Sequence, residues 1–211
     1  MATTTPNYGW DVPTSTDYVK DGATAIETLG DDIDASLYSI TNGKNVGLVP
    51  LITTAFTTQT AVQIDNVFSS TYDNYRIVFA QSACTASNSI INFKFVDGTT
   101  PTSSSLFYYG ATGLGAGASA VSNNGSATSS VIVNRIETSA GDIASFSMDV
   151  INPNKANRTV FLWSAYNYNG AVTFSFVGGG EWDATTQFEG FYLAPGSGTF
   201  TGTVSVYGYR K

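Results

Sequence analysis

The strongest constraint on the fold of this 211-residue chain is a two-residue alternation of apolar and polar side chains through residues 55–211. Successive side chains of a β-strand point to opposite faces, so this period indicates strands with one buried face and one face in water. Segments with this alternation or a similar strand signal are 62–64, 75–79, 91–95, 104–110, 129–137, 146–150, 160–168, 172–176, 186–194 and 204–206. These segments predict a mainly β protein.

Short sequences rich in glycine, asparagine and proline separate the predicted strands. The candidate turns are Asp97-Gly98, Asn124-Gly125, Asn152-Pro153-Asn154, Asn169-Gly170, Gly178-Gly179-Gly180 and Pro195-Gly196. The Asn169-Gly170 pair predicts a tight hairpin, because both residues tolerate the positive φ angles of a two-residue turn. Roughly ten short strands at this spacing predict an antiparallel β-sandwich or jelly-roll head over residues 55–211.

The N-terminal part has a different pattern. Residues 1–13 are expected to form an extended docking arm, because Pro6 and Pro13 disfavour helix in the residues before them. Tyr8 and Trp10 are too few to make a core, so we expect them to dock on a partner or to fold back onto the chain's own domain. Residues 42–54 are predicted to be a linker.

Residues 14–41 contain the one convincing helical pattern. Thr14, Ser15 and Thr16 offer N-cap oxygens, and Asp17 would lie in the first turn. The apolar residues recur near the heptad period of a coiled coil: Ile26, Leu29, Ile33, Leu37 and Ile40. So narrow a stripe does not stabilise an isolated helix, so we expect pairing with copies of itself. Recurring isoleucine at the seam favours a homotrimer, whereas the alternative is packing against the chain's own β domain.

Two stretches resemble parts of known phage proteins. Residues 5–26, TPNYGWDVPTSTDYVKDGATAI, closely resemble the N-terminal segment of many tailed-phage minor tail proteins and tail fibres, where different C-terminal domains follow it. Residues 68–78 and 201–209 resemble the first and last strands of a β-sandwich common in phage fibres. The resemblance implies a virion protein assembled in the host cytoplasm, whose arm and helix attach it to other virion proteins. Residues 85–190 are unmatched, so the resemblance implies no receptor site there.

The residues available for catalysis are few. The chain has no histidine, and Cys84 is its only cysteine, which removes the commonest general base and any thiolate cluster. Glu181, Asp183 and Glu189 could supply a glycosidase pair, but Glu181-Trp182-Asp183 follows three glycines, which favours exposed loop acids. We therefore expect no enzymatic activity, no cofactor and no metal.

Aromatic side chains are the remaining candidate surface. Tyrosine and tryptophan combine a flat apolar ring with a polar tip, which suits contact with a host-surface glycan. The candidate contacts are Tyr108, Tyr109, Tyr166, Tyr168 and Trp182. Some of these residues are also needed to fill the sandwich core, so core packing is the competing interpretation.

Charge and hydropathy exclude other classes of partner. The net charge is −7 and no run of lysine or arginine occurs, which disfavours nucleic acid and anionic membranes. No apolar run approaches the roughly 20 residues that span a bilayer, and the N-terminus lacks a signal-peptide pattern, so we expect synthesis and retention in a cytoplasm. The alternatives to a tail fibre are a head- or capsid-associated fibre or decoration protein, a non-virion carbohydrate-binding module, and a polysaccharide-degrading enzyme.

Overall fold

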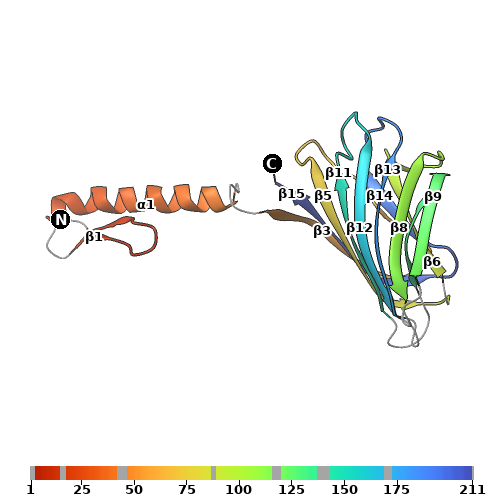
Figure 1. Ribbon diagram of the computed structural model, residues 1–211. Coiled ribbons are helices and arrows are strands. Elements are labelled where there is room, and N and C mark those ends of the chain that lie inside the picture. Colours follow the sequence, from red (N-terminus) through yellow and green to blue (C-terminus); the bar gives the residue numbers. More distant parts are fainter. Residues whose placement is uncertain are drawn as a thin grey trace. The chain divides into compact units, whose positions relative to one another are not determined.

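The computed structural model describes residues 3–14, 18–41, 47–86, 89–115, 120–136, 143–168 and 173–210. The chain divides into two compact units, Met1–Gly47 and Leu48–Lys211 (Figure 1). The first unit contains a short hairpin and a helix, and the second contains two β-sheets.

The second unit is an antiparallel β-sandwich. Its larger sheet has eight strands, in spatial order β3 (Leu48–Gln59), β15 (Phe200–Tyr209), β5 (Asn74–Cys84), β11 (Ile143–Ile151), β12 (Thr159–Tyr168), β13 (Thr173–Trp182), β8 (Phe107–Gly115) and β9 (Ala120–Thr128). Its smaller sheet has the order β10 (Val131–Ile136), β6 (Ser89–Asp97), β14 (Gly190–Pro195) and β4 (Val62–Ile64), and β7 (Thr100–Pro101) pairs with β6. The prediction of a mainly β, antiparallel sandwich is confirmed.

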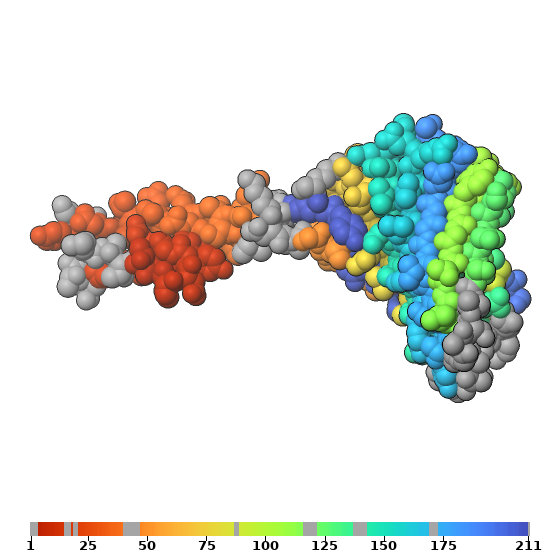
Figure 2. Space-filling model, viewed as in Figure 1, coloured from red at the N-terminus to blue at the C-terminus, as the bar shows by residue number. Residues whose placement is uncertain are grey.

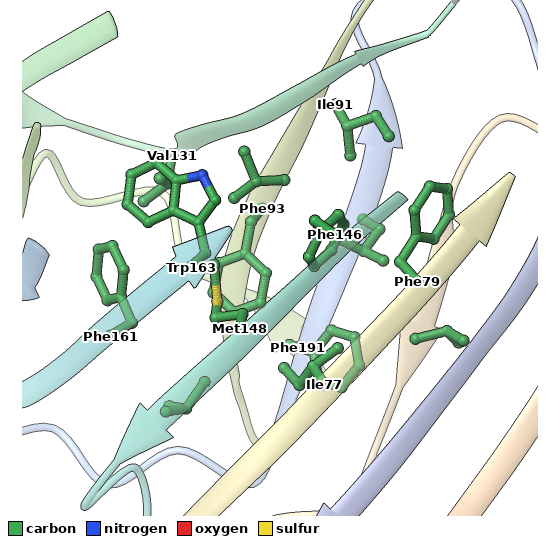
Figure 3. Close-up of a cluster of buried hydrophobic side chains, with 14 of the residues drawn as sticks. Ile77, Phe79, Ile91, Phe93, Val131, Phe146, Met148, Phe161, Trp163 and Phe191 are labelled. Carbon is green, nitrogen blue, oxygen red and sulfur yellow. The ribbon is translucent and has the colours of Figure 1, made fainter. Parts of the chain in front are cut away.

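The core between the two sheets is rich in phenylalanine. Figure 3 shows side chains of β5, β11 and β12 meeting those of β6, β10 and β14: Ile77, Phe79, Phe146, Met148, Phe161, Trp163, Ile91, Phe93, Val131 and Phe191. All ten are buried. Rings also stack directly, with 4.5 Å between the centroids of Phe95 and Phe188 and 5.2 Å between those of Phe79 and Phe146. Burial of each large apolar side chain contributes about 1.5–3 kcal/mol, so this layer is the main source of the unit's stability.

The predicted start of the β domain and one of its predicted turns are corrected. β3 begins at Leu48, inside the predicted 42–54 linker, of which residues 42–46 lie outside the described residues. The predicted Asn124-Gly125 turn lies within β9, beside a register shift in its pairing with β8. The predicted Asn169-Gly170 hairpin lies outside the described residues.

The triple glycine Gly178-Gly179-Gly180 is also not a turn, because it lies inside β13. A Cβ added at Gly178 would lie only 2.6 Å from two ring carbons of Trp163, so this glycine provides space for a ring of the core. A Cβ added at Gly180 would meet the Tyr108 carbonyl oxygen first and would lie 2.6 Å from Tyr109 Cβ and 2.8 Å from Phe161 Cζ, so this glycine allows the close approach of β8 as well as of a ring. Two further glycines, Gly113 and Gly115, also lie inside a strand, β8.

The first unit contains the strands β1 (Thr3–Thr4) and β2 (Asp11–Val12) and the helix α1 (Val19–Thr41), which β2 contacts. The expected extended arm is instead a two-stranded antiparallel hairpin. The Thr5 amide donates to the Trp10 carbonyl at 2.8 Å, and the Gly9 amide donates to the Thr5 carbonyl at 3.0 Å. Gly9 has a φ of +68°, which closes the turn that follows Pro6. The predicted cap residues 15–17 lie outside the described residues.

Candidate functional site

Helix α1 presents an apolar stripe that its own chain leaves largely uncovered. At 100° per residue, Ile26, Leu29, Ile33 and Leu37 fall within an arc of about 80°. Ile26 is 64% exposed and Leu37 is 54% exposed, whereas Leu29 and Ile33 are half-buried. The side chain of Ile40, the fifth predicted seam residue, lies outside the described part. The stripe is a candidate surface for self-association.

The acidic side chains of α1 lie away from this stripe. Glu27, Asp31 and Asp34 fall about 100° or more from its centre, and Asp21 and Asp32 fall on its other flank. This separation leaves the stripe uncharged along its length. Identical helices can therefore approach through the stripe without opposing their carboxylates directly.

The two aromatic residues of the predicted docking arm lie together at the hairpin turn. The rings of Tyr8 and Trp10 stack with 5.1 Å between their centroids and an interplanar angle of 20°. Tyr8 is 67% exposed, whereas Trp10 is half-buried, and the Trp10 amide donates to Thr5 Oγ1 at 3.0 Å. The hairpin thus holds an aromatic pair in a fixed orientation, which is suitable for docking.

The predicted glycan-contacting aromatics divide between the two faces of the larger sheet. Tyr108, Tyr166 and Tyr168 point outward. Tyr109 and Trp182 are buried core residues, so their prediction as contacts was wrong. Tyr109 follows Tyr108 in β8 and must point to the opposite face, and burial raises the pKa of its hydroxyl. Trp182 packs against Phe107 and Phe188, with centroids 4.9 and 5.3 Å away.

The three outward tyrosines do not form a single site. Tyr108 and Tyr166 are each 37% exposed. Tyr166 pairs with Ser175 in β13, and Ser175 pairs with Leu114 in β8. Leu114 is six residues from Tyr108, which corresponds to about 20 Å along the strand. Tyr108 and Tyr166 therefore lie on separate parts of the sheet face and can be tested separately.

The outward side chains of the eight-stranded sheet, called here the outer sheet face, are mostly small and neutral. Figure 2 shows β11, β12, β13, β8 and β9 side by side as one continuous surface. One cross-strand row passes through all eight strands: Thr53, Ser205, Val78, Ser147, Ser164, Val177, Thr112 and Ser122. Exposed aliphatic side chains, among them Leu162, Val177 and Leu114, also lie on this face. The face is thus suited to uncharged partners.

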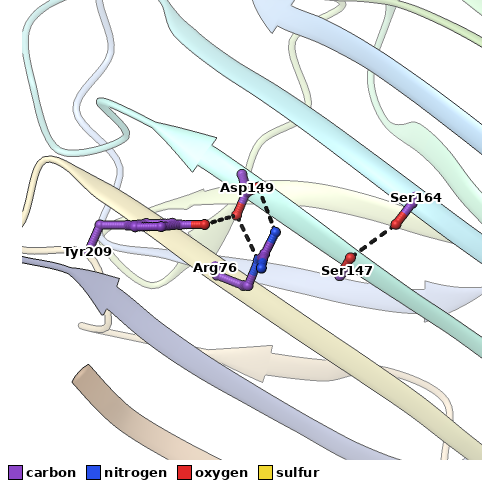
Figure 4. A network of polar contacts seen from close by, with 5 residues as sticks. All are labelled: Arg76, Ser147, Asp149, Ser164 and Tyr209. Atoms are coloured by element: carbon purple, nitrogen blue, oxygen red, sulfur yellow. Dashed lines mark hydrogen bonds and ion pairs between the residues drawn. The ribbon is translucent and has the colours of Figure 1, made fainter. Parts of the chain in front are cut away.

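One charged pair on the outer sheet face is internally compensated (Figure 4). Arg76 Nε and Nη2 donate to the two Asp149 carboxylate oxygens at 2.9 and 3.0 Å, and the Tyr209 hydroxyl donates to Asp149 Oδ1 at 2.7 Å. The hydrogen bond to Asp149 raises the pKa of Arg76. Burial, followed by the bond to Asp149, raises the pKa of Tyr209. The network links β5, β11 and β15 without adding net charge.

A second charged group lies at the ends of β12 and β13. Arg158 Nη1 donates to Glu181 Oε1 at 2.8 Å, and Arg158 Nη2 forms an ion pair with Asp183 Oδ1. All three side chains are partly exposed, and the bond to Glu181 followed by the charge of Asp183 raises the pKa of Arg158. Glu181 is the penultimate residue of β13, so it is not a loop acid as predicted.

Sequence reasoning missed Arg158 as a surface residue of interest. The alternation of β12 contained a usable signal, because residues 158, 160 and 162 share the face of Tyr166. The contact of Arg158 with two acids required the β12–β13 register, which pairs Val160 with Glu181. The sequence does not give that register directly.

No group of three or more histidine, cysteine, aspartate or glutamate residues that could hold a metal ion occurs in the described ranges. Within those same parts of the chain, no helix has the length and apolar character required to cross a membrane.

The architecture defines an antiparallel β-sandwich protein with an N-terminal hairpin–helix unit. No protein-family model matches the chain, and no curated protein matches it. Three surfaces of the chain are candidates for a function: the α1 stripe, the Tyr8–Trp10 pair and the outer sheet face.

Proposed function

We propose that this protein is a structural phage virion component, a homotrimeric tail-fibre or appendage subunit without enzymatic activity. In this proposal α1 trimerises, the hairpin attaches the subunit to other virion proteins, and the β-sandwich is the exposed head. The observation that carries the proposal is the uncharged stripe of α1, where Ile26 and Leu37 are more than half exposed.

The energetics favour association through this stripe. A lone helix of this length is marginal in water, and its stability depends on packing of an apolar face. Complete burial of each isoleucine or leucine would contribute about 1.5–3 kcal/mol, and the stripe supplies four such residues in every copy. Three helices that share one seam would bury these side chains together.

The resemblance to phage tail proteins supports the same proposal. The resembling residues, 5–26, include the hairpin turn with Tyr8 and Trp10 and the beginning of α1, so they fall within one compact unit. Aromatic side chains are frequent anchors at protein interfaces. Three stacked pairs on one trimer would also bind more tightly together than each pair alone.

The trimer is tested by light scattering coupled to size-exclusion chromatography. One chain has a mass of 22.3 kDa, so the trimer is expected at 3 × 22.3 kDa, about 67 kDa. Ile33→Asp places three unpaired charges at one level of the seam, which costs several kcal/mol and should dissociate the trimer. Ala35→Asp adds the same charge on the opposite side of α1 and should leave the trimer intact.

Two outcomes would contradict this proposal. A monomeric wild-type protein would favour the alternative of a carbohydrate-binding module without a virion. A trimer that survives Ile33→Asp would mean that α1 is not the trimerisation element. Cross-linking in intact particles would identify the virion protein that contacts the hairpin. Its identity would distinguish attachment to a capsid from attachment to a tail.

A further inference from the structure

Two outward-facing glycines leave a region of the outer sheet face without side chains. Gly179 of β13 pairs directly with Gly110 of β8, and the same cross-strand row continues to Leu162 on one side and Asn124 on the other. A Cβ added at Gly110 would meet no atom within 4 Å. A Cβ at Gly179 would lie 2.8 Å from Leu162 Cδ2, so Leu162 leans over that position. The open region at Gly110 is called here the Gly110 gap.

The neighbouring rows enclose this gap. On one end lie Tyr108 and Glu181, which pair with each other, and on the other end lie Thr112 and Val177. Tyr108 and Thr112 are four residues apart, or about 13 Å, and the β12 and β9 strands on either side are three strand spacings apart, or about 14 Å. These dimensions match the scale of one or two sugar rings.

The border of the gap combines an aromatic ring with several hydrogen-bonding groups. The Tyr108 ring is partly exposed beside Glu181. Glu181 shares Arg158 with Asp183, and each of these three side chains remains at least one-third exposed. The exposed Asn124 adds a carboxamide on the opposite border. Donors and acceptors thus surround a surface formed by backbone, a tyrosine ring and Leu162.

We propose that the Gly110 gap binds a neutral sugar ring of a surface polysaccharide. The apolar face of the pyranose would pack on Tyr108 and against Leu162, because aromatic rings with a polar tip suit the two-sided chemistry of sugars. The sugar hydroxyls would bond to Glu181, Arg158 and Asn124. One guanidinium balances only one of the two carboxylates, so the local charge is −1, and it disfavours acidic sugars.

This inference rests on the proposed function only in naming a host-surface polysaccharide as the ligand. All of the residues belong to the β-sandwich unit. A trimer that binds no sugar would overturn the inference and not the fibre, whereas a monomer that binds sugar would do the reverse. Light scattering and sugar binding therefore distinguish the two failures.

The experiment uses the full-length protein and ligand-observed saturation-transfer NMR. The probes are four neutral trisaccharides (maltotriose, cellotriose, chitotriose and mannotriose), with sialyllactose and trigalacturonic acid as acidic counterparts. At least one neutral trisaccharide should bind saturably with a dissociation constant on the order of 1 mM, a value usual for a shallow site. The acidic probes should bind at least fivefold more weakly.

Two variants and one matched control locate the site. Gly110→Val fills the gap where an added Cβ meets nothing, so it should weaken binding at least tenfold without lowering the melting temperature. Tyr108→Ala should weaken binding at least fivefold. Tyr166→Ala removes an equally exposed tyrosine from the same face, about 20 Å from Tyr108 along the strand direction. This control variant should change binding less than twofold. Gly110→Ala is the substitute if the valine variant does not fold.

Three results would overturn the proposal. The first is the absence of saturable binding for every neutral trisaccharide at concentrations on the order of 10 mM. The second is undiminished binding by a folded Gly110 variant. The third is an equal loss of binding in Tyr166→Ala and Tyr108→Ala, which would place the site elsewhere on the outer sheet face.

Discussion

The glycine run of β13 allows a sharp test of which residues of the larger sheet face the core. A Cβ added at the inward Gly178 would lie 2.6 Å from two Trp163 ring carbons and 2.7 Å from Ala111 Cβ. One added at the outward Gly110, on the neighbouring strand, would meet no atom within 4 Å. Gly178→Ala and Gly110→Ala add the same methyl group to the same sheet, so the second variant is the matched control of the first.

The expected stabilities of the two variants have opposite signs. Gly178→Ala forces Trp163 or β13 to move, and such overpacking costs about 1–3 kcal/mol. Gly110→Ala restricts the unfolded chain without a clash and should gain about 0.4–1 kcal/mol. The restriction of the unfolded chain is common to both variants, so their free energies of unfolding should differ by the overpacking cost, about 1–3 kcal/mol. For domains of about 150–250 residues, each kcal/mol shifts the melting temperature by about 2–4 °C.

Urea unfolding measures this difference, with tryptophan fluorescence as the signal because Trp163 and Trp182 are buried. Circular dichroism provides an independent curve for the same samples. If Gly178→Ala proves as stable as the wild type, Gly178 does not lie beneath Trp163. The glycine run would then be the turn that the sequence alone predicts.

Three further predictions test other parts of the molecule. A fragment of residues 48–211 should give a β-type circular dichroism spectrum and a cooperative melt, and an aggregated product would show that its core needs the N-terminal unit. Trp10→Ala should leave the melting temperature of the isolated protein nearly unchanged but reduce incorporation into particles, and a clear loss of stability would make Trp10 a core residue. Because the pKa of Tyr209 is raised above its usual 10.0, the stability that this residue contributes should be fully present below pH 10 and should decrease as the pH rises further. Tyr209→Phe should reduce that decrease in pH-dependent urea unfolding, and an unchanged slope would contradict the role of Tyr209.

Local alternation predicted much of the sandwich, because it reports burial without knowledge of the neighbouring strands. The pattern of Tyr75, Ile77 and Phe79 indicated a strand with one buried face, and all three residues are core residues of β5. The same signal indicates that Tyr108 and Tyr109 point to opposite faces. It does not show which of the two faces the core, so both could be proposed as glycan contacts.

The features that sequence reasoning missed depend on cross-strand neighbours. Gly178-Gly179-Gly180 has the composition of a turn, and only the position of Trp163 beside Gly178 shows that the run makes room for a ring. Likewise, the pairing of Gly179 with Gly110 joins residues that are far apart in the chain. The hairpin at Thr5 and Trp10 was missed because a prolyl residue indicates an extended segment as well as a turn.

The order of the strands has a consequence for folding during synthesis. The last strand, β15, lies inside the larger sheet, where it pairs with β3 on one side and with β5 on the other. The first strand of the unit, β3, lies at the sheet edge and has β15 as its neighbour in the sheet. Chains emerge from the ribosome N-terminus first, so α1 is complete long before β3 can find this neighbour. Assembly of α1 helices from different copies can therefore precede completion of the sheet. A chain that ends before Phe200 lacks β15, the strand with which β3 pairs in the sheet.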